Sequence, residues 1–502
     1  MNSMYHLFFN CLQKLMWLIT LFWLVVVVQE LWSFPSLFLY GLALLVLLVM
    51  WKKNAVHRLY CYAMAHKRYL LGLALVFQVL VILSANLLVR RDAAVVITGA
   101  LRLLDGQSIS NYLTRNPNNL PMFLYARALY HLFGFEALWV LQVLGVFYIN
   151  GTAYILYRTG RDFFSQRVAD SLFTLYLLLL GFSPYVIQTY TDITSLPFLA
   201  GQLYLMVALL KEERNATQRL CALGLLTAIA SIFRPTALVI VIAFTMLLFL
   251  KEGWQRFVHY MAILVCSFGF IFAGLTYVIR HQQEVKIIHD ETLAKGLTTF
   301  INLGLTYSGT DQEDMKAGLL NYIDSEKRSD YNNGMFAKEN EIKEIKRRLR
   351  NYTAVTFVQH LKYKLAMTLY DGSLNWIYRK PENEKTPLVS PLYKYTKENR
   401  VAEAIRQSII EYEGDYYQYY QVVKQFIWLV AVLGLVIAVW RYRPDDTINF
   451  LSLAIFGGLL FLMIFEGGKT RYLLQFFPQI LLLSSLGLTR LCDKEGTKEV
   501  EL

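Results

Sequence analysis

Long apolar segments alternate with short polar ones along almost the whole chain. A helix needs about 20 predominantly apolar residues to cross a bilayer, and twelve segments approach that length with few charges in their middles. We therefore predict an all-α polytopic membrane protein with about twelve transmembrane helices. The predicted spans are 8–30, 35–51, 69–90, 136–157, 168–184, 193–210, 220–233, 235–250, 257–280, 422–440, 447–466 and 472–490.

Only Arg234 separates the spans predicted at 220–233 and 235–250, so this pair admits two interpretations. The chain either turns at Arg234-Pro235 as a helical hairpin or continues as one kinked helix. Basic residues favour cytoplasmic loops, and only the hairpin places every short basic loop on the same side. We therefore predict a multi-pass protein of the cell membrane with both termini in the cytoplasm. The inner loops are then 52–68, 158–167, 211–219, 251–256 and 441–446.

Charge is sparse and predominantly positive. Charged residues make up 17% of the chain and the net charge is +12, whereas soluble proteins carry about 25% charged residues. The positive excess lies mostly in the loops predicted to face the cytoplasm, where it also attracts anionic membrane lipid. It therefore reflects membrane topology, and we predict no nucleic-acid partner.

The predicted spans divide the chain into four regions. Residues 1–68 form an N-terminal transmembrane hairpin and inner loop, and residues 69–280 form a transmembrane core with an outer loop at 91–135, the expected place of a catalytic site. Residues 281–421 are polar, contain no predicted span and are expected to be a mainly helical extracellular region. Residues 422–502 hold the C-terminal transmembrane helices and a cytoplasmic tail.

The outer loop contains an apolar stretch, 95–104, that is too short to span and fits a juxtamembrane helix in the interface. Asp105-Gly106 predicts a turn. Two prolines and four asparagines argue against a regular helix over 111–121. The segment 122–133 is apolar enough to re-enter the membrane or to lie along it.

In the extracellular region, apolar residues recur at helical spacing from Phe336 to Leu369, with basic residues between them. This pattern predicts an amphipathic helix. Two interpretations are open: the helix packs against the spanning bundle or lies in lipid headgroups, or it is an ordinary helix with a solvated polar face.

Several ionisable residues lie where the predicted spans end on the outer side, and an ionisable group at a membrane boundary is a functional candidate. Asp92 follows Arg90 and Arg91 directly after the third span. A carboxylate near cations stays ionised and can accept a proton from an attacking hydroxyl as a general base. The alternative is a solvated boundary charge paired with Arg91.

Asp192 is the second catalytic candidate, at the outer start of the sixth span in the sequence QTYTD. It could orient a substrate, hold a divalent cation or assist Asp92. It could equally cap the helix that begins there, since Asp is a favoured N-cap residue.

Cations on the outer side run against the positive-inside rule, which marks Arg234, Lys469 and Arg471 as candidates. Arg binds phosphate oxygens bidentately and Lys acts as a point charge, so these residues predict a phosphate site. Pairing with Glu466 or with lipid headgroups is the alternative. The remaining substrate-binding candidates are Arg91, Arg115, Asn118, Asn119, Tyr190, Glu466, Tyr472 and His289, of which His289 also fits a solvated loop.

In their order and common face, these patches resemble GT-C glycosyltransferases, and more specifically bacterial membrane glycosyltransferases related to the protein mannosyltransferases and common in Gram-positive envelope loci. The patches are Asp92, 112–121 (YLTRNPNNLP), 190–192 (YTD), 233–235 (FRP) and 466–472 (EGGKTRY). The resemblance implies a polyprenyl-phosphate sugar as donor, used on the outer face. It implies that Asp92 is the catalytic acidic residue and that outer Arg and Lys residues hold the lipid phosphate.

One departure from the resemblance concerns metal use. Residue 93 is Ala, so no second carboxylate adjoins Asp92, where that family often has an acidic pair. No cofactor is therefore predicted firmly, and a divalent cation, Mg²⁺ or Mn²⁺, remains an option.

These observations predict an inverting membrane glycosyltransferase with an extracellular active site, Asp92 as general base and a secondary cell-wall polymer, teichoic acid or capsule as acceptor. A polysaccharide polymerase or ligase acting on lipid-diphosphate oligosaccharides is the first alternative, because it too would have many spans and outer arginines. A lipid-linked sugar flippase or transporter is the second. The nearly uncharged span centres argue against it, since transporters place polar groups near the midplane.

Overall fold

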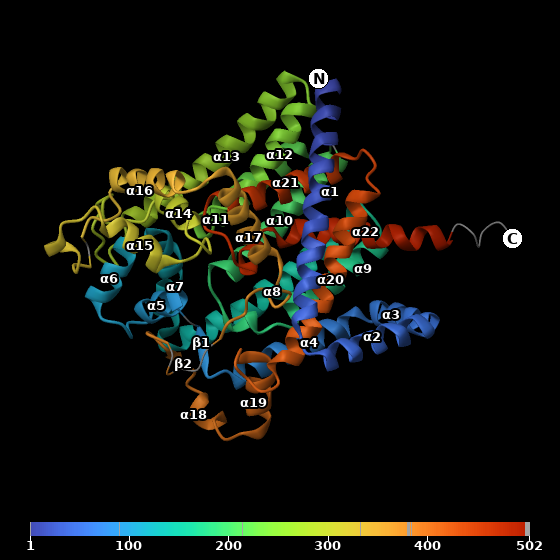
Figure 1. Cartoon of the computed structure of the whole chain (residues 1–502), viewed down its shortest axis with the longest axis horizontal. Helices are drawn as coiled ribbons and strands as arrows, with labels where there is room; N and C mark the ends of the chain where they lie inside the picture. Colours follow the sequence, from blue (N-terminus) through green and yellow to red (C-terminus); the bar gives the residue numbers. More distant parts are fainter. Residues whose placement is uncertain are drawn as a thin grey trace.

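Helices form nearly all the regular structure of the chain (Figure 1). The computed structural model describes residues 2–89, 91–212, 214–331, 333–378, 382 and 384–496. Within these residues one small antiparallel sheet is present, in which β1 (Leu87–Val89) pairs with β2 (Leu388–Val389). The predicted fold class, an all-α polytopic membrane protein, is therefore confirmed.

Nine helical segments of the described chain are long and apolar enough to cross a membrane, or ten if the bent pair α2 (Ser36–Trp51) and α3 (Lys53–Ala65) is one span. The sequence pattern predicts twelve. Three predicted spans are short helices instead: α2 bends by 89° into α3, α9 (Gln166–Tyr176) passes into the π-helical turn η3 (Leu177–Gly181), and α12 (Ala237–Lys251) has 15 residues. Hydropathy records apolar length and not where a helix bends or stops, so it overcounts.

The long segments pack as a bundle in which α11 lies along α13, α20 along α22, α10 along α8, and α1 along α20. Their buried faces are mostly apolar, with buried polar side chains such as Gln78, Gln202 and Lys424 among them. The segments are α1 (Asn2–Ser33), α4 (Lys67–Ser84), α7 (Leu120–Phe133) continued through η2 (Gly134–Glu136) by α8 (Ala137–Phe163), α10 (Thr191–Lys211), α11 (Ala216–Phe233), α13 (Trp254–Arg280), α20 (Tyr417–Trp440), α21 (Asp446–Ile464), and η8 (Thr470–Phe476) with α22 (Phe477–Gly496).

The ion pairs at one end of the bundle show that α11 and α12 form a hairpin. Lys211, just before α11, lies 3.1 Å from Asp445, and Lys251, at the end of α12, lies 2.7 Å from Asp446. The start of α11 and the end of α12 therefore share one end of the bundle, and the chain reverses at Arg234-Pro235. Tyr5 also bonds to Asp446, which brings the N-terminal helix to this end. The cytoplasmic location of this end stays a prediction.

The polar segments gather at another part of the molecule, on the left of Figure 1, where α5 (Arg91–Ala100), α6 (Gly106–Arg115) and α7 lie beside α14 (Leu297–Gly304), α15 (Gln312–Leu320) and α16 (Lys338–Arg350). The predicted span 69–90 is too long, because α4 ends at Ser84 and the chain continues as β1 against β2. Two further short helices, α18 (Tyr393–Thr396) and α19 (Arg400–Ile405), follow β2.

Two helix predictions for these polar segments need correction. The segment 111–121 was not expected to be helical, yet α6 runs through Arg115, and the break lies where Pro117 begins the 3-10 turn η1 (Pro117–Asn119). Asp105-Gly106 is a helix start and not the predicted turn: Asp105 is the N-cap of α6, and its carboxylate accepts a hydrogen bond of 2.8 Å from the Ser108 amide. A side-chain oxygen at that position satisfies an amide that the first helical turn leaves unpaired.

The amphipathic helix predicted from Phe336 to Leu369 is two helices, α16 and α17 (Ala354–Leu369). Its packing is also different, because α16 turns Glu341, Glu344 and Arg348 inward and leaves Ile342 and Leu349 exposed. Hydrogen bonds explain the inward carboxylate of Glu341, which accepts from the hydroxyls of two threonines on α14. α16 packs on α14 and α15, and it is α17 that contacts the spanning bundle.

Candidate functional site

Asp92 lies in the first turn of α5 with its side chain exposed. Arg91, immediately before it, has a φ of 52°, a left-handed conformation that turns the chain into the helix. None of the ion pairs among the described residues includes Asp92, so the alternative of a boundary charge paired with Arg91 is not observed. Arg90 lies outside the described residues. Asp92 is therefore a carboxylate open to an incoming group.

Two hydrogen bonds join Tyr112 of α6 to Tyr190 at the start of α10, beside Asp92. The Tyr190 hydroxyl donates to the side-chain carbonyl of Asn119, whose amide donates to the Tyr112 hydroxyl over 2.8 Å. Burial, and after it the negative charge of Asp92, raises the pKa of the Tyr112 hydroxyl. Tyr112 therefore remains neutral, and the buried Asn119 holds the hydroxyls of the two tyrosines together near the Asp92 charge.

Asp192 has the opposite surroundings. Its side chain is fully buried in the first turn of α10, and it accepts from two arginines. The Arg471 guanidinium approaches one carboxylate oxygen at 2.7 and 2.8 Å, and Arg234 binds the other. The N-cap of α10 is Tyr190, so Asp192 does not serve as that cap. It holds two arginines, each about one-fifth exposed, side by side where α10 begins.

Glu466, Lys469 and Arg471 lie on the segment between α21 and α22. The chain turns there through Gly468, whose φ is 75° and whose amide donates to the Thr368 hydroxyl at 2.9 Å. Lys364 of α17 braces the same segment, because its ammonium donates to the carbonyls of Met463 at 3.0 Å and Phe465 at 2.6 Å. Two residues of α17 thus fix the backbone that carries the predicted phosphate-binding cations.

The carboxylate of Glu466 accepts a hydrogen bond from the Tyr472 hydroxyl across the turn that leads into η8. Both side chains are partly buried, as is Lys469 at the start of η8. The structure therefore brings together two of the predicted substrate-binding residues, Glu466 and Tyr472. Pairing of Glu466 with Arg234 or Arg471 is not observed among the described contacts, since both arginines bind Asp192.

Lys295 is a site residue that the sequence reasoning missed. Burial lowers the pKa of its ammonium, while the charges of Asp92 and Glu466 act on it in the opposite direction. Lys295 therefore lies within electrostatic reach of both carboxylates, while its ammonium donates to the Gln312 side chain at 3.5 Å. It sits in a loop with no motif around it, and its amide donates to the Arg115 carbonyl at 3.0 Å. Nothing local in the sequence signals this approach.

Arg115 stacks on an aromatic ring from the 281–421 region. Its guanidinium carbon lies 3.8 Å from the centre of the Tyr331 ring, a cation–π contact. Burial, and after it the nearby Arg115 and Asp92 charges, acts on the Tyr331 hydroxyl, with a net rise of its pKa. The contact closes one side of the cluster with residues from the 281–421 region.

Three predicted substrate-binding residues contribute less. Arg91, Asn118 and His289 are exposed. The segment that carries His289 is held to α6 by a hydrogen bond of 3.1 Å from the Ile288 amide to the Thr114 hydroxyl. No contact in the described structure joins the His289 side chain to the cluster.

The cluster offers little to a metal ion. No group of three or more His, Cys, Asp and Glu side chains that could hold one occurs among the described residues. Asp192 already accepts from two arginines and Glu466 from Tyr472. These residues do not fit the Mg²⁺ or Mn²⁺ option, and the reaction proposed below has no step through a metal ion.

The cluster as a whole combines an exposed carboxylate with an excess of cations. The carboxylates are Asp92, Asp192 and Glu466, and the cations are Arg115, Arg234, Lys295, Lys469 and Arg471. Such a site can accept a proton at one point and stabilise an anionic group at another.

The comparisons with known proteins agree with a membrane location. The family model described as "Conserved hypothetical integral membrane protein" matches residues 4–491. No curated protein matches the chain. Among solved structures, the chain is similar to ArnT from Cupriavidus metallidurans bound to undecaprenyl phosphate, with 14% identity, a TM-score of 0.31 and coverage of 85% of this chain and 78% of that one. ArnT from the same organism in the apo state gives 12% identity, a TM-score of 0.30, and coverage of 84% and 78%.

Proposed function

We propose that this chain, which belongs to the family of conserved hypothetical integral membrane proteins, is a GT-C-type membrane glycosyltransferase. It transfers a sugar from a polyprenyl-phosphate donor to a cell-envelope glycan, such as a secondary cell-wall polymer, teichoic acid or capsule. One observation carries the proposal: the exposed carboxylate of Asp92 lies near Tyr112, Asn119 and Tyr190, which are hydrogen-bonded to one another at the start of α10, where the buried Asp192 holds two arginines together.

The reaction uses the two parts of this cluster differently. A hydroxyl of the acceptor gives its proton to Asp92 as its oxygen attacks the anomeric carbon of the donor sugar, with inversion. The bond between that carbon and the phosphate oxygen breaks, and the lipid phosphate leaves with the electron pair. Arg234 and Arg471 stabilise the phosphate, and Lys469 adds a third positive charge.

The buried Asp192 is a positioning residue in this proposal. Two guanidinium groups side by side repel each other, and a carboxylate between them offsets that repulsion. Arg donates through five N–H groups, so each arginine keeps donors for a phosphate after pairing with Asp192. The clamp therefore stands ready before the donor binds.

The membrane supports the choice of donor. The cluster lies where helices end, and several neighbouring helices are long and apolar enough to contact a polyprenyl chain. The basic loops lie at the other end of the bundle, as the Lys211 and Lys251 ion pairs indicate. By the positive-inside rule, the cluster then faces the extracellular side.

The test is transfer of radiolabelled sugar from polyprenyl-phosphate sugars in proteoliposomes, comparing wild type with Asp92→Ala. Glu313→Ala is the matched control, because Glu313 is an exposed carboxylate paired with Lys316 on α15. We expect transfer by wild type and by the control, and none above background by Asp92→Ala.

Two other outcomes would assign another function. Elongation of a lipid-diphosphate oligosaccharide, with no transfer from any monophosphate donor, would identify the polymerase or ligase. Movement of labelled lipid across the bilayer without a new glycosidic bond would identify the flippase.

A further inference from the structure

A cavity of about 480 Å³ lies between α5, α6, α7 and the segment that follows α13. None of the residues assigned above to catalysis or donor binding lines it. Its lining carries the cations Arg102, Arg127 and Lys286 against one carboxylate, Glu284. We propose that this cavity binds the phosphate group of an anionic lipid. The inference goes beyond the proposed function and does not depend on it.

Arg127 is the main reason for the proposal. It is 6% exposed on α7, and only one of its terminal nitrogens is satisfied, by a 3.1 Å hydrogen bond to the Gly99 carbonyl. The other terminal nitrogen and Nε are buried without a hydrogen-bond partner. Glu284 lies 3.7 Å from Nε, an ion-pair distance too long for a hydrogen bond. A buried guanidinium with unused donors is costly, and a phosphate in the cavity would satisfy them.

Two further cations enter the cavity from other elements. Arg102 follows α5 with a φ of 59°, a left-handed conformation that L side chains rarely adopt, and its guanidinium carbon lies 5.8 Å from the centre of the Tyr130 ring. Lys286 belongs to the segment after α13, which is fixed to α6 because its carbonyl accepts from the Ser110 hydroxyl at 2.5 Å. Glu284 is also occupied, since it lies 3.0 Å from His131. The cavity therefore has a net positive charge.

The position of the cavity favours a lipid as the source of the phosphate. It lies where α7, part of an apolar segment of membrane-spanning length, meets the end of α13, another such segment. Leu104 and Ile109 line it. Leu103, which follows Arg102 in the sequence, and Leu132, which follows His131, are exposed apolar side chains. Cations beside exposed apolar surface at a membrane boundary suit a headgroup whose tails remain in the bilayer.

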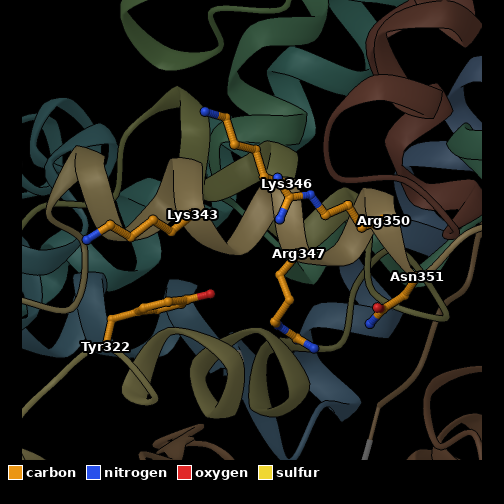
Figure 2. A pocket seen from close by; sticks show the side chains of 6 residues that line it. All are labelled: Tyr322, Lys343, Lys346, Arg347, Arg350 and Asn351. Carbon is orange, nitrogen blue, oxygen red and sulfur yellow. The ribbon is translucent and has the colours of Figure 1, made fainter.

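A second basic hollow on the molecule is different and serves as the control. It has about 460 Å³ and is lined by Tyr322, Lys343, Lys346, Arg347, Arg350 and Asn351. Figure 2 shows that its basic side chains fan out from α16 in different directions. Arg347 is neutralised by the buried Glu344 at 2.6 Å. This hollow has positive charge but no convergent, unsatisfied donor.

The experiment measures the binding of dioctanoyl phosphatidic acid to the purified full-length protein in detergent, by calorimetry and by the rise in unfolding temperature. Dioctanoylglycerol lacks the phosphate and inorganic phosphate lacks the acyl tails. Binding of these two compounds therefore distinguishes a lipid headgroup from free phosphate as the source of the bound phosphate. The variants are Arg102→Gln, Lys286→Gln and Arg127→Gln, with Lys346→Gln as the matched control on the second hollow.

We expect phosphatidic acid to bind and dioctanoylglycerol not to bind. Each exposed-cation variant should weaken the affinity about fivefold, Arg127→Gln about tenfold or more, and Lys346→Gln not at all.

If inorganic phosphate alone binds with the same dependence on these variants, the phosphate site stands and its source is free phosphate. Equal binding of dioctanoylglycerol, or an equal loss in Lys346→Gln, would overturn the proposal. Arg102 and Lys286 are exposed, so their variants remain informative if Arg127→Gln does not fold. The experiment measures lipid binding and not sugar transfer, so a negative result leaves the proposed function unaffected.

Discussion

Asp92 and Asp192 both lie near the hydrogen-bonded group Tyr112, Asn119 and Tyr190, yet their surroundings are opposite. Asp92 is exposed and in no ion pair among the described residues, whereas Asp192 is fully buried and bound by two arginines. An open carboxylate can exchange a proton with an incoming group. A buried carboxylate already bound by two cations instead fixes the positions of those cations. Two residues of one type at the same end of the bundle therefore have different roles, set by burial and pairing.

The largest expected effect on folding comes from removing the buried member of this comparison. Asp192→Ala leaves Arg234 and Arg471 without their shared partner, and breaking a buried ion pair in this way costs about 3 to 5 kcal/mol. We expect a large fall in unfolding temperature in detergent. Glu313→Ala, which breaks an exposed pair, should cost about 1 kcal/mol or less. Equal, small shifts in both variants would show that Asp192 does not hold the arginines.

The next effect concerns the clamp itself. Arg471→Gln removes a charge-assisted contact to the donor phosphate, and such contacts contribute about 1.5 to 3 kcal/mol. The KM for the polyprenyl-phosphate sugar should rise about tenfold or more, and Arg471→Lys should recover part of the loss by keeping the charge. An unchanged KM in Arg471→Gln would place the phosphate elsewhere.

The smallest effect tests the polar group between the two aspartates. Tyr112→Phe removes the hydroxyl that lies near the Asp92 charge and accepts from Asn119, at little cost in volume. We expect kcat to fall several-fold, since one neutral hydrogen bond contributes about 1 kcal/mol, with no change in donor KM. Tyr331→Phe is the comparison, because the Tyr331 ring stacks on Arg115 and would be kept. A loss of stability without any change in kcat would make Tyr112 purely structural.

Much of this arrangement could be predicted from local sequence. Apolar length indicated the membrane class, and the positive-inside rule indicated the hairpin at Arg234-Pro235. The rule also singled out Arg234 and Arg471 as cations on the wrong side, and these two residues bind the same aspartate. Boundary charges are informative because a membrane makes each one costly.

The rest depends on long-range contacts that no local pattern encodes. Lys295 comes within electrostatic reach of Asp92 and Glu466 only through the packing of the 281–421 region. The inward face of α16 carries Glu341 because threonines of α14 meet its carboxylate, so apolar periodicity gave the wrong buried face. The short helices were overcounted as spans because composition does not locate a bend such as the 89° angle between α2 and α3.

The most direct test of the account is the steady-state kinetics of Asp92→Asn with a polyprenyl-phosphate sugar donor, on protein whose unfolding temperature matches wild type. The variant keeps the shape and exposure of the side chain but cannot take up the acceptor proton. We predict a fall in kcat of about 10² to 10⁴-fold with an unchanged donor KM. A wild-type kcat, or a raised KM with kcat unchanged, would contradict the assignment of Asp92 as the base.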